Sequence, residues 1–81
     1  MAAGEQWKQE GDAIVRDLEF EDFKAAMAAV NRVADVAEEA NRHPDILVHD
    51  YNRVRLMLTT HSERRVTDAD HEMAGRIDGV L

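Results

Sequence analysis

Cysteine is absent from this chain of 81 residues. Disulfide frameworks, zinc sites built on thiolates and thiol catalysis are therefore excluded. A chain of this length forms one small domain, which buries roughly 60–65% of the surface that its unfolded state would expose. We therefore expect a modestly stable single domain over residues 1–81, in which residues 1–6 form a loose tail.

Positive charge and long apolar runs are also scarce. Lys and Arg number 10 against 17 Asp and Glu, which gives a formal net charge of -7. Nucleic-acid-binding proteins carry a basic face, and basic segments bind anionic membranes, so we expect neither partner. No apolar run approaches the ~20 residues of a membrane span, and charged side chains fill the place of a secretory signal. These absences predict a cytoplasmic protein.

Two periodicities divide the chain into six elements. Apolar and polar residues alternate in two predicted β-hairpins, with strands near residues 7–9 and 13–20, and at 46–49 and 53–60. A spacing of three and four predicts a helix over residues 21–40, which the single proline, Pro44, should end. A second helix should follow Thr67. The order β-β-α-β-β-α predicts an α+β domain: a four-stranded antiparallel sheet with helices packed on one face.

The same periodicities predict which side chains are buried. The strands should direct Ile14, Leu18, Phe20, Val54, Leu56 and Leu58 inward, with Arg16 interrupting the apolar side. The long helix should bury Phe23, Met27, Val30, Val33 or Ala34, and Ala37, and the second helix Met73, Ile77 and Val80 or Leu81. Glu21 and Asp22 should lie in the first turn of the long helix, where its dipole favours negative charge.

Two histidines flank the second predicted hairpin. With a turn centred near Tyr51 and Asn52, opposed residue numbers add up to roughly 103 or 104, so His43 would face Thr60 or His61. Facing side chains lie ~5 Å apart. Because an unperturbed histidine titrates near pH ~6.5, one ring can donate a proton while the other accepts one. Such a pair suits the removal of water from a substrate with a hydroxyl beside an N–H, and needs no metal or other cofactor.

The spacing of several residues resembles a known family. Glu38, Arg42-His43-Pro44-Asp45, Tyr51-Asn52, Thr60-His61 and Asp70 resemble pterin-4a-carbinolamine dehydratases, and the wider pattern covers roughly residues 7 to 78. The resemblance implies a lyase that dehydrates 4a-hydroxytetrahydrobiopterin to the quinonoid dihydropterin during tetrahydrobiopterin regeneration. It also implies a four-stranded antiparallel sheet with helices on one face, and a homodimer or homotetramer.

The resemblance further implies roles for individual residues. His43 and His61 would be the catalytic pair. Substrate contacts would come from Arg42, Pro44, Thr60, Ser62 and Glu63, while Glu38 and Asp70 would orient neighbouring groups. The chain departs from the family at Arg42, where a histidine is usual, and arginine cannot accept a proton because it stays charged.

Structural alternatives exist for these residues. Arg42 lies four positions after Glu38, the spacing of an ion pair on a helix surface, and Asp70 lies at a capping position after Thr67. A metal site built on His43, His61 and a carboxylate is disfavoured, because the separations match no compact ligand motif. The alternative function is a dehydratase-like binding module that has lost its chemistry and acts as a dimerisation or assembly factor for another protein.

Overall fold

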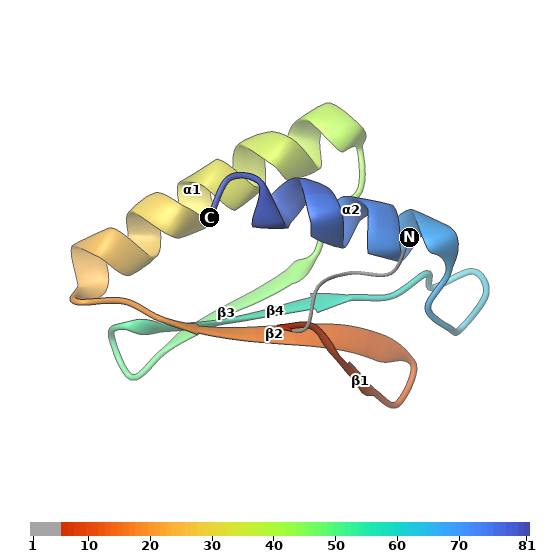
Figure 1. The fold of residues 1–81 in the computed structure, drawn as a ribbon, viewed down its shortest axis with the longest axis horizontal. Helices are drawn as coiled ribbons and strands as arrows, with labels where there is room; N and C mark the ends of the chain where they lie inside the picture. The colour runs from red at the N-terminus through yellow and green to blue at the C-terminus, as the bar shows by residue number, and fades with distance from the viewer. Residues whose placement is uncertain (1–5) are drawn as a thin grey trace.

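Two hairpins form one sheet, and two helices cover one of its faces (Figure 1). The computed structural model describes residues 6–81, so most of the predicted tail lies outside the described residues. The elements are β1 (Lys8–Glu10), β2 (Ala13–Glu19), α1 (Phe23–Ala40), β3 (Asp45–His49), β4 (Arg53–Leu58) and α2 (Asp68–Asp78). The strands form one antiparallel sheet in the order β1-β2-β4-β3. The predicted α+β arrangement is confirmed.

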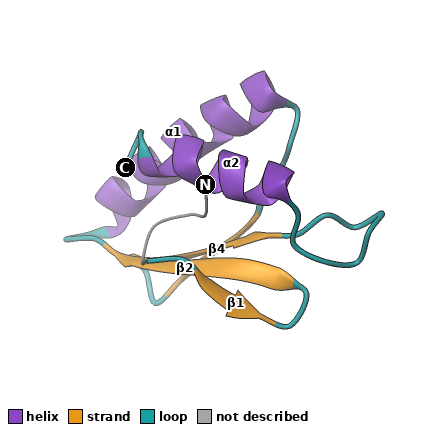
Figure 2. Cartoon of the chain, turned by 45° about the vertical axis from the view of Figure 1, so that its right-hand side comes forward, coloured by secondary structure: helices purple, strands orange, loops and turns teal. Residues whose placement is uncertain are grey.

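The core lies between the sheet and the helix layer (Figure 2). Ile14, Val54, Leu56 and Leu58 are buried from the strands, and Met73, Ala74 and Ile77 from α2. From α1 the buried residues are Ala26, Ala29, Val33 and Ala37. One prediction for this helix is wrong, because Phe23 is 53% exposed. Of the alternatives Val33 and Ala34, Val33 is the buried one. The buried stripe of α1 includes the small residues Ala26, Ala29 and Ala37. Among residues 6–81, no helix is both long enough and apolar enough to cross a membrane.

The charged residue on the apolar side of β2 has a partly buried partner. Arg16 Nη1 donates to Asp78 Oδ1, at the end of α2, and the same oxygen accepts from Trp7 Nε1 at 2.8 Å. Trp7 is itself buried. The interruption at Arg16 therefore ties the first hairpin to α2 rather than exposing the sheet.

The ends of α1 differ from those predicted. Asp22 lies outside the first turn and is the N-cap, where its side chain accepts from the Ala25 N–H at 2.7 Å. At the other end Asn41 adopts a left-handed conformation with φ 52°, and the Arg42 N–H donates to the Ala37 carbonyl at 3.1 Å. Asn41, not Pro44, therefore ends the helix, because an Asn in this conformation is a common helix stop.

The second hairpin has a different register from the predicted one. The prediction places Asp45 opposite residue 58 or 59, whereas the structure pairs it with Met57. Three residues separate the strands, and two of them, Asp50 and Tyr51, have positive φ angles of 49° and 55°. The paired strands also stop at Asp45 and Leu58, so His43 and His61 lie in the flanking loops and do not face each other across the ladder.

Candidate functional site

The segments that flank the second hairpin form a pocket of about 230 Å³. It is lined by Asn41, Arg42, His43, Leu58, Thr59, Thr60, His61 and Ser62. Its volume is a little below the ~300 Å³ at the lower end of typical small-molecule sites, so it suits a small ligand. Both predicted catalytic histidines therefore reach the same pocket, although not by the predicted cross-strand pairing.

His43 is held by the last turns of α1. Its Nε2 lies 2.6 Å from Glu38 Oε2, and both side chains are mostly exposed. Because an ionised carboxylate only accepts hydrogen bonds, Nε2 must carry the hydrogen in this contact. The ring is thereby oriented, and Nδ1 is left to accept or hold a proton.

His61 stands at the start of a compact loop that leads into α2. The Thr60 N–H donates to the Arg65 carbonyl at 3.1 Å, and the Arg64 N–H donates to the His61 carbonyl at 3.2 Å. Arg64 adopts a positive φ of 55° at this turn. The loop is closed by its own backbone, which places the exposed His61 side chain at the pocket edge.

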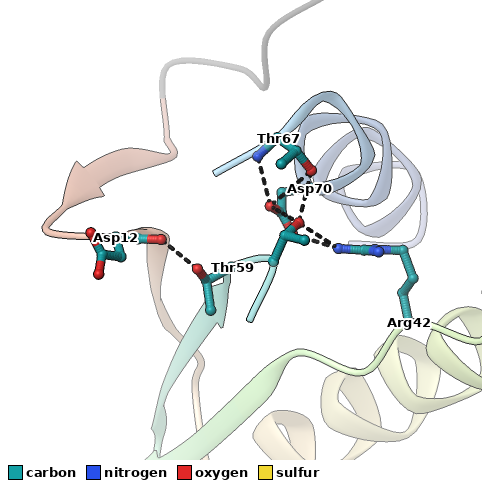
Figure 3. Close-up of polar contacts among 6 residues, drawn as sticks. Asp12, Arg42, Thr59, Thr67 and Asp70 are labelled. Carbon is teal, nitrogen blue, oxygen red and sulfur yellow. Dashed lines mark hydrogen bonds and ion pairs between the residues drawn. The ribbon is translucent and has the colours of Figure 1, made fainter. Parts of the chain in front are cut away.

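Arg42 does not make the helical ion pair with Glu38. The helix ends at Ala40, so the regular spacing of four residues no longer sets the direction of the Arg42 side chain. Its Nη2 atom donates instead to Asp70 Oδ1 at 2.9 Å and to Thr60 Oγ1 at 3.1 Å. Figure 3 shows the guanidinium group reaching from the end of α1 to Asp70 at the start of α2.

Asp70 is a fully buried carboxylate, with 0% exposure. Its Oδ2 accepts from the Thr67 N–H at 2.9 Å, which is the capping contact, and from Thr60 Oγ1 at 2.8 Å. Burial by itself raises the pKa of Asp70, but the hydrogen bonds from Thr67, Thr60 and Arg42 outweigh it, so the pKa lies below its usual value. Asp70 therefore stays ionised inside the protein.

Two predicted substrate contacts lie beside the pocket. Pro44 and Glu63 are not among its lining residues; the Glu63 N–H donates to the Thr60 carbonyl at 3.1 Å, and its carboxylate lies 3.5 Å from Arg65. Within residues 6–81, no group of three or more His, Asp or Glu side chains is arranged to hold a metal ion. Sequence reasoning missed the contact between Arg42 and Asp70, which joins residues 28 positions apart.

Comparisons with known proteins identify the family of the chain. The family model described as "Pterin 4 alpha carbinolamine dehydratase" matches residues 1–80. A protein of Thermomicrobium roseum named "Putative pterin-4-alpha-carbinolamine dehydratase" is 51% identical over 71 residues, which cover 88% of this chain and 75% of that protein. A protein of Koribacter versatilis with the same name is 50% identical over 74 residues, or 91% of this chain and 78% of that one.

Two solved structures share the fold. A crystal structure described as a transcriptional coactivator/pterin dehydratase from Brucella melitensis has a TM-score of 0.84 and 35% identity, covering 94% of this chain and 82% of that one. A pterin dehydratase-like protein identified as a RuBisCO assembly factor in the alpha-carboxysome has a TM-score of 0.72 and 19% identity, covering 91% of this chain and 84% of that one. Together with the family match, these relatives show that the chain belongs to the pterin-4-alpha-carbinolamine dehydratase family.

Proposed function

We propose that this protein is a cofactor-independent lyase that dehydrates 4a-hydroxytetrahydrobiopterin to the quinonoid dihydropterin during tetrahydrobiopterin regeneration. The observation that carries the proposal is that His43 and His61 line one small pocket in a chain of this family. Positioned proton transfer contributes typically ~10²–10⁴-fold to a rate, which is the size of effect that two histidines can supply.

The chemistry needs one acid and one base. His61 protonates the departing hydroxyl, and the carbon–oxygen bond breaks as water leaves. His43 takes the proton from the neighbouring N–H through Nδ1, and the electrons of that N–H bond form the carbon–nitrogen double bond. We give His43 the role of base because Glu38 already fixes hydrogen on its Nε2. Ser62, which lines the pocket, would donate or accept a hydrogen bond with the pterin ring. The Thr60 hydroxyl is already engaged by Arg42, Thr67 and Asp70, and Pro44 and Glu63 would flank the pocket without lining it.

The test is a rate assay with 4a-hydroxytetrahydropterin in which the spontaneous reaction is subtracted. Wild-type protein should accelerate dehydration, and His43→Ala and His61→Ala should each lose most of the acceleration while keeping the wild-type circular dichroism spectrum. Wild-type protein that is folded and gives no acceleration over buffer would rule out the enzyme. Full activity in either variant would show that the acid–base pair is assigned wrongly.

A second candidate is a binding module that assembles another protein. Four large hydrophobic side chains of the described residues lie exposed: Phe23 at 53%, Leu47 at 48%, Tyr51 at 65% and Leu81 at 36%. The fold match to a RuBisCO assembly factor shows that this architecture can serve such a role in another protein. Replacing Leu47 and Tyr51 with serine separates the two functions: a binding module would lose its partner, and a lyase would keep its rate.

A further inference from the structure

Arg42 stands where the family usually has a histidine, and its contacts suggest what it does instead. Its Nη2 atom reaches Thr60 Oγ1 at 3.1 Å and Asp70 Oδ1 at 2.9 Å. Thr60 belongs to the 58–62 segment that also lines the pocket, and Asp70 to the first turn of α2. One guanidinium group therefore connects three separate segments of the chain.

The hydrogen bonds around Arg42 allow a single assignment of donors and acceptors. Ionised Asp70 only accepts, so the one hydroxyl hydrogen of Thr60 points to Asp70 Oδ2 at 2.8 Å. The Thr60 oxygen is then free to accept from Arg42 and from the Thr67 hydroxyl, which lies 2.7 Å away. The network is partly buried: its hydroxyls, the Asp70 carboxylate and Arg42 Nη2 satisfy one another, whereas Arg42 Nε has no partner among the described residues. Hydrogen bonds that support one another in this way make a site rigid and costly to rearrange.

Two members of the network are the residues immediately before the two proposed catalytic histidines in the sequence. Arg42 precedes His43, and Thr60 precedes His61. The hydrogen bond between Arg42 and Thr60 therefore joins the backbone neighbours of both imidazoles. A displacement of ~1 Å in catalytic geometry can cost about 10²-fold in rate, so this spacing matters more than the bond's own energy.

We infer that Arg42 is a positioning residue, which fixes the separation of His43 and His61 by tying the 41–44 segment to Thr60 and to buried Asp70. The inference rests on the proposed function only in that the histidines carry the chemistry. Arginine suits the task because its planar group offers several donors in a fixed geometry, whereas lysine offers a point charge on a flexible stem.

The kinetic test is a double-mutant cycle on Arg42→Gln and Asp70→Asn. Each single variant should lower kcat by about 10–100-fold while KM stays within about threefold, because misplaced histidines slow the chemical step rather than weaken binding. The double variant should lose little beyond either single one, since the two act as a unit. Losses that simply multiply, or a loss confined to KM, would overturn the inference and make Arg42 a direct contact to the pterin.

Three further variants serve as controls for this result. Arg42→Lys should recover only part of the lost kcat, because it keeps the charge without the two N–H donors that Nη2 holds in one plane. If Asp70→Asn does not fold, Thr60→Val removes the hydrogen bond between Arg42 and Thr60, leaves the ion pair between Arg42 and Asp70, and should lower kcat in the same direction. Arg55→Gln breaks a two-bond contact with Asp17, at 2.8 and 3.0 Å on the opposite side of the sheet, and should leave kcat within about twofold of wild type.

A measurement without substrate separates failure of this inference from failure of the proposed function. Amide hydrogen exchange reports the Thr60 and Thr67 N–H groups, which donate to the Arg65 carbonyl and to Asp70. Arg42→Gln should speed exchange at both sites although the substitution lies in a different segment of the chain. Unchanged exchange would overturn the inference even in an active enzyme. Faster exchange in a protein without dehydratase activity would support the positioning role of Arg42 and reject only the proposed dehydration reaction.

Discussion

Two arginine–aspartate pairs of similar length occupy very different regions of this molecule. At the pocket end, Arg42 lies 2.9 Å from Asp70, which is wholly buried. On the sheet face opposite the helices, Arg55 contacts Asp17 at 2.8 Å, and the Asp17 side chain is 60% exposed. We call this second region the open face; it carries Asp17, Leu47, His49, Arg53 and Arg55. Contact distance alone does not distinguish the pairs, but burial and the segments that they join do.

The open face also has the larger hollow, of about 420 Å³. Its charged groups already have partners within the sheet and its turn, because Arg55 contacts Asp17, Arg53 lies 3.8 Å from Glu19, and His49 Nδ1 lies 3.1 Å from Asp50. The pocket end is smaller but holds two imidazoles. The proposal places the function at the pocket end because of its chemistry, not because of its volume.

The largest expected effect comes from removing one histidine from each of the two regions and comparing the losses. His61→Ala should lower kcat by about 10²–10⁴-fold, because it removes a proton donor from the pocket. The matched control is His49→Ala, which deletes the same side chain from the open face and should leave kcat unchanged. Steady-state kinetics checks both. Equal losses in the two variants would mean that the comparison between the regions is mistaken.

The next effect concerns stability. Asp70→Asn should lower the free energy of unfolding by about 1–3 kcal/mol, because it leaves buried donors without their charged acceptor. Asp17→Asn should cost much less, since solvent screens and replaces its contact with Arg55. Urea denaturation of the two variants and wild type gives the comparison. A larger loss at Asp17 than at Asp70 would contradict the importance of burial.

A third effect depends on pH and salt. Hydrogen bonds from Arg55 hold the pKa of Asp17 below its usual value, so both aspartates titrate at a lower pH folded than unfolded. Their stabilisation is therefore present above the unfolded pKa of about 4 and disappears as pH falls through the lowered folded pKa. Asp70→Asn should reduce the loss of stability at low pH to the same extent in 1 M salt and in dilute buffer. Asp17→Asn should reduce that loss of stability only in dilute buffer, because salt screens exposed charges. Thermal melts between pH 2 and 6 distinguish the two.

The smallest effect lies at the tip of the second hairpin, away from both pairs. Tyr51 is 65% exposed and has a positive φ of 55°, which is unfavourable for a bulky side chain. Tyr51→Asn should raise the free energy of unfolding by up to about 1 kcal/mol, since Asn tolerates this conformation better. Chemical denaturation measures the change. A loss of stability would show that the tyrosine ring makes a contact that matters in solution.

Local patterns in the sequence were sufficient for the architecture. The alternation around Ile14 and Leu56 and the helical spacing up to Ala37 predict the elements, and Met73 and Ile77 are buried as expected. The prediction of the register was wrong because the register depends on the backbone of the turn. The residue types at Asp50 and Tyr51 do not predict two consecutive positive φ angles.

The site was predictable in part for a similar reason. The two histidines could be proposed from their places around the hairpin, but the partners of Arg42 and Arg16 could not. Arg42 leaves a helix that stops at Ala40, so its direction depends on the packing of α2, and Arg16 meets Asp78 from the far end of the chain. Contacts of this kind are set by tertiary structure, and no short-range spacing encodes them.

The most direct test of the central claim is a crystal structure with a reduced pterin that lacks the 4a-hydroxyl and so cannot react. We predict that the ring lies in the pocket lined by residues 41–43 and 58–62, with its reacting carbon within reach of both His43 and His61. A ring bound on the open face beside Arg53 and Arg55, or a pocket in which one imidazole points away from the ring, would contradict the claim.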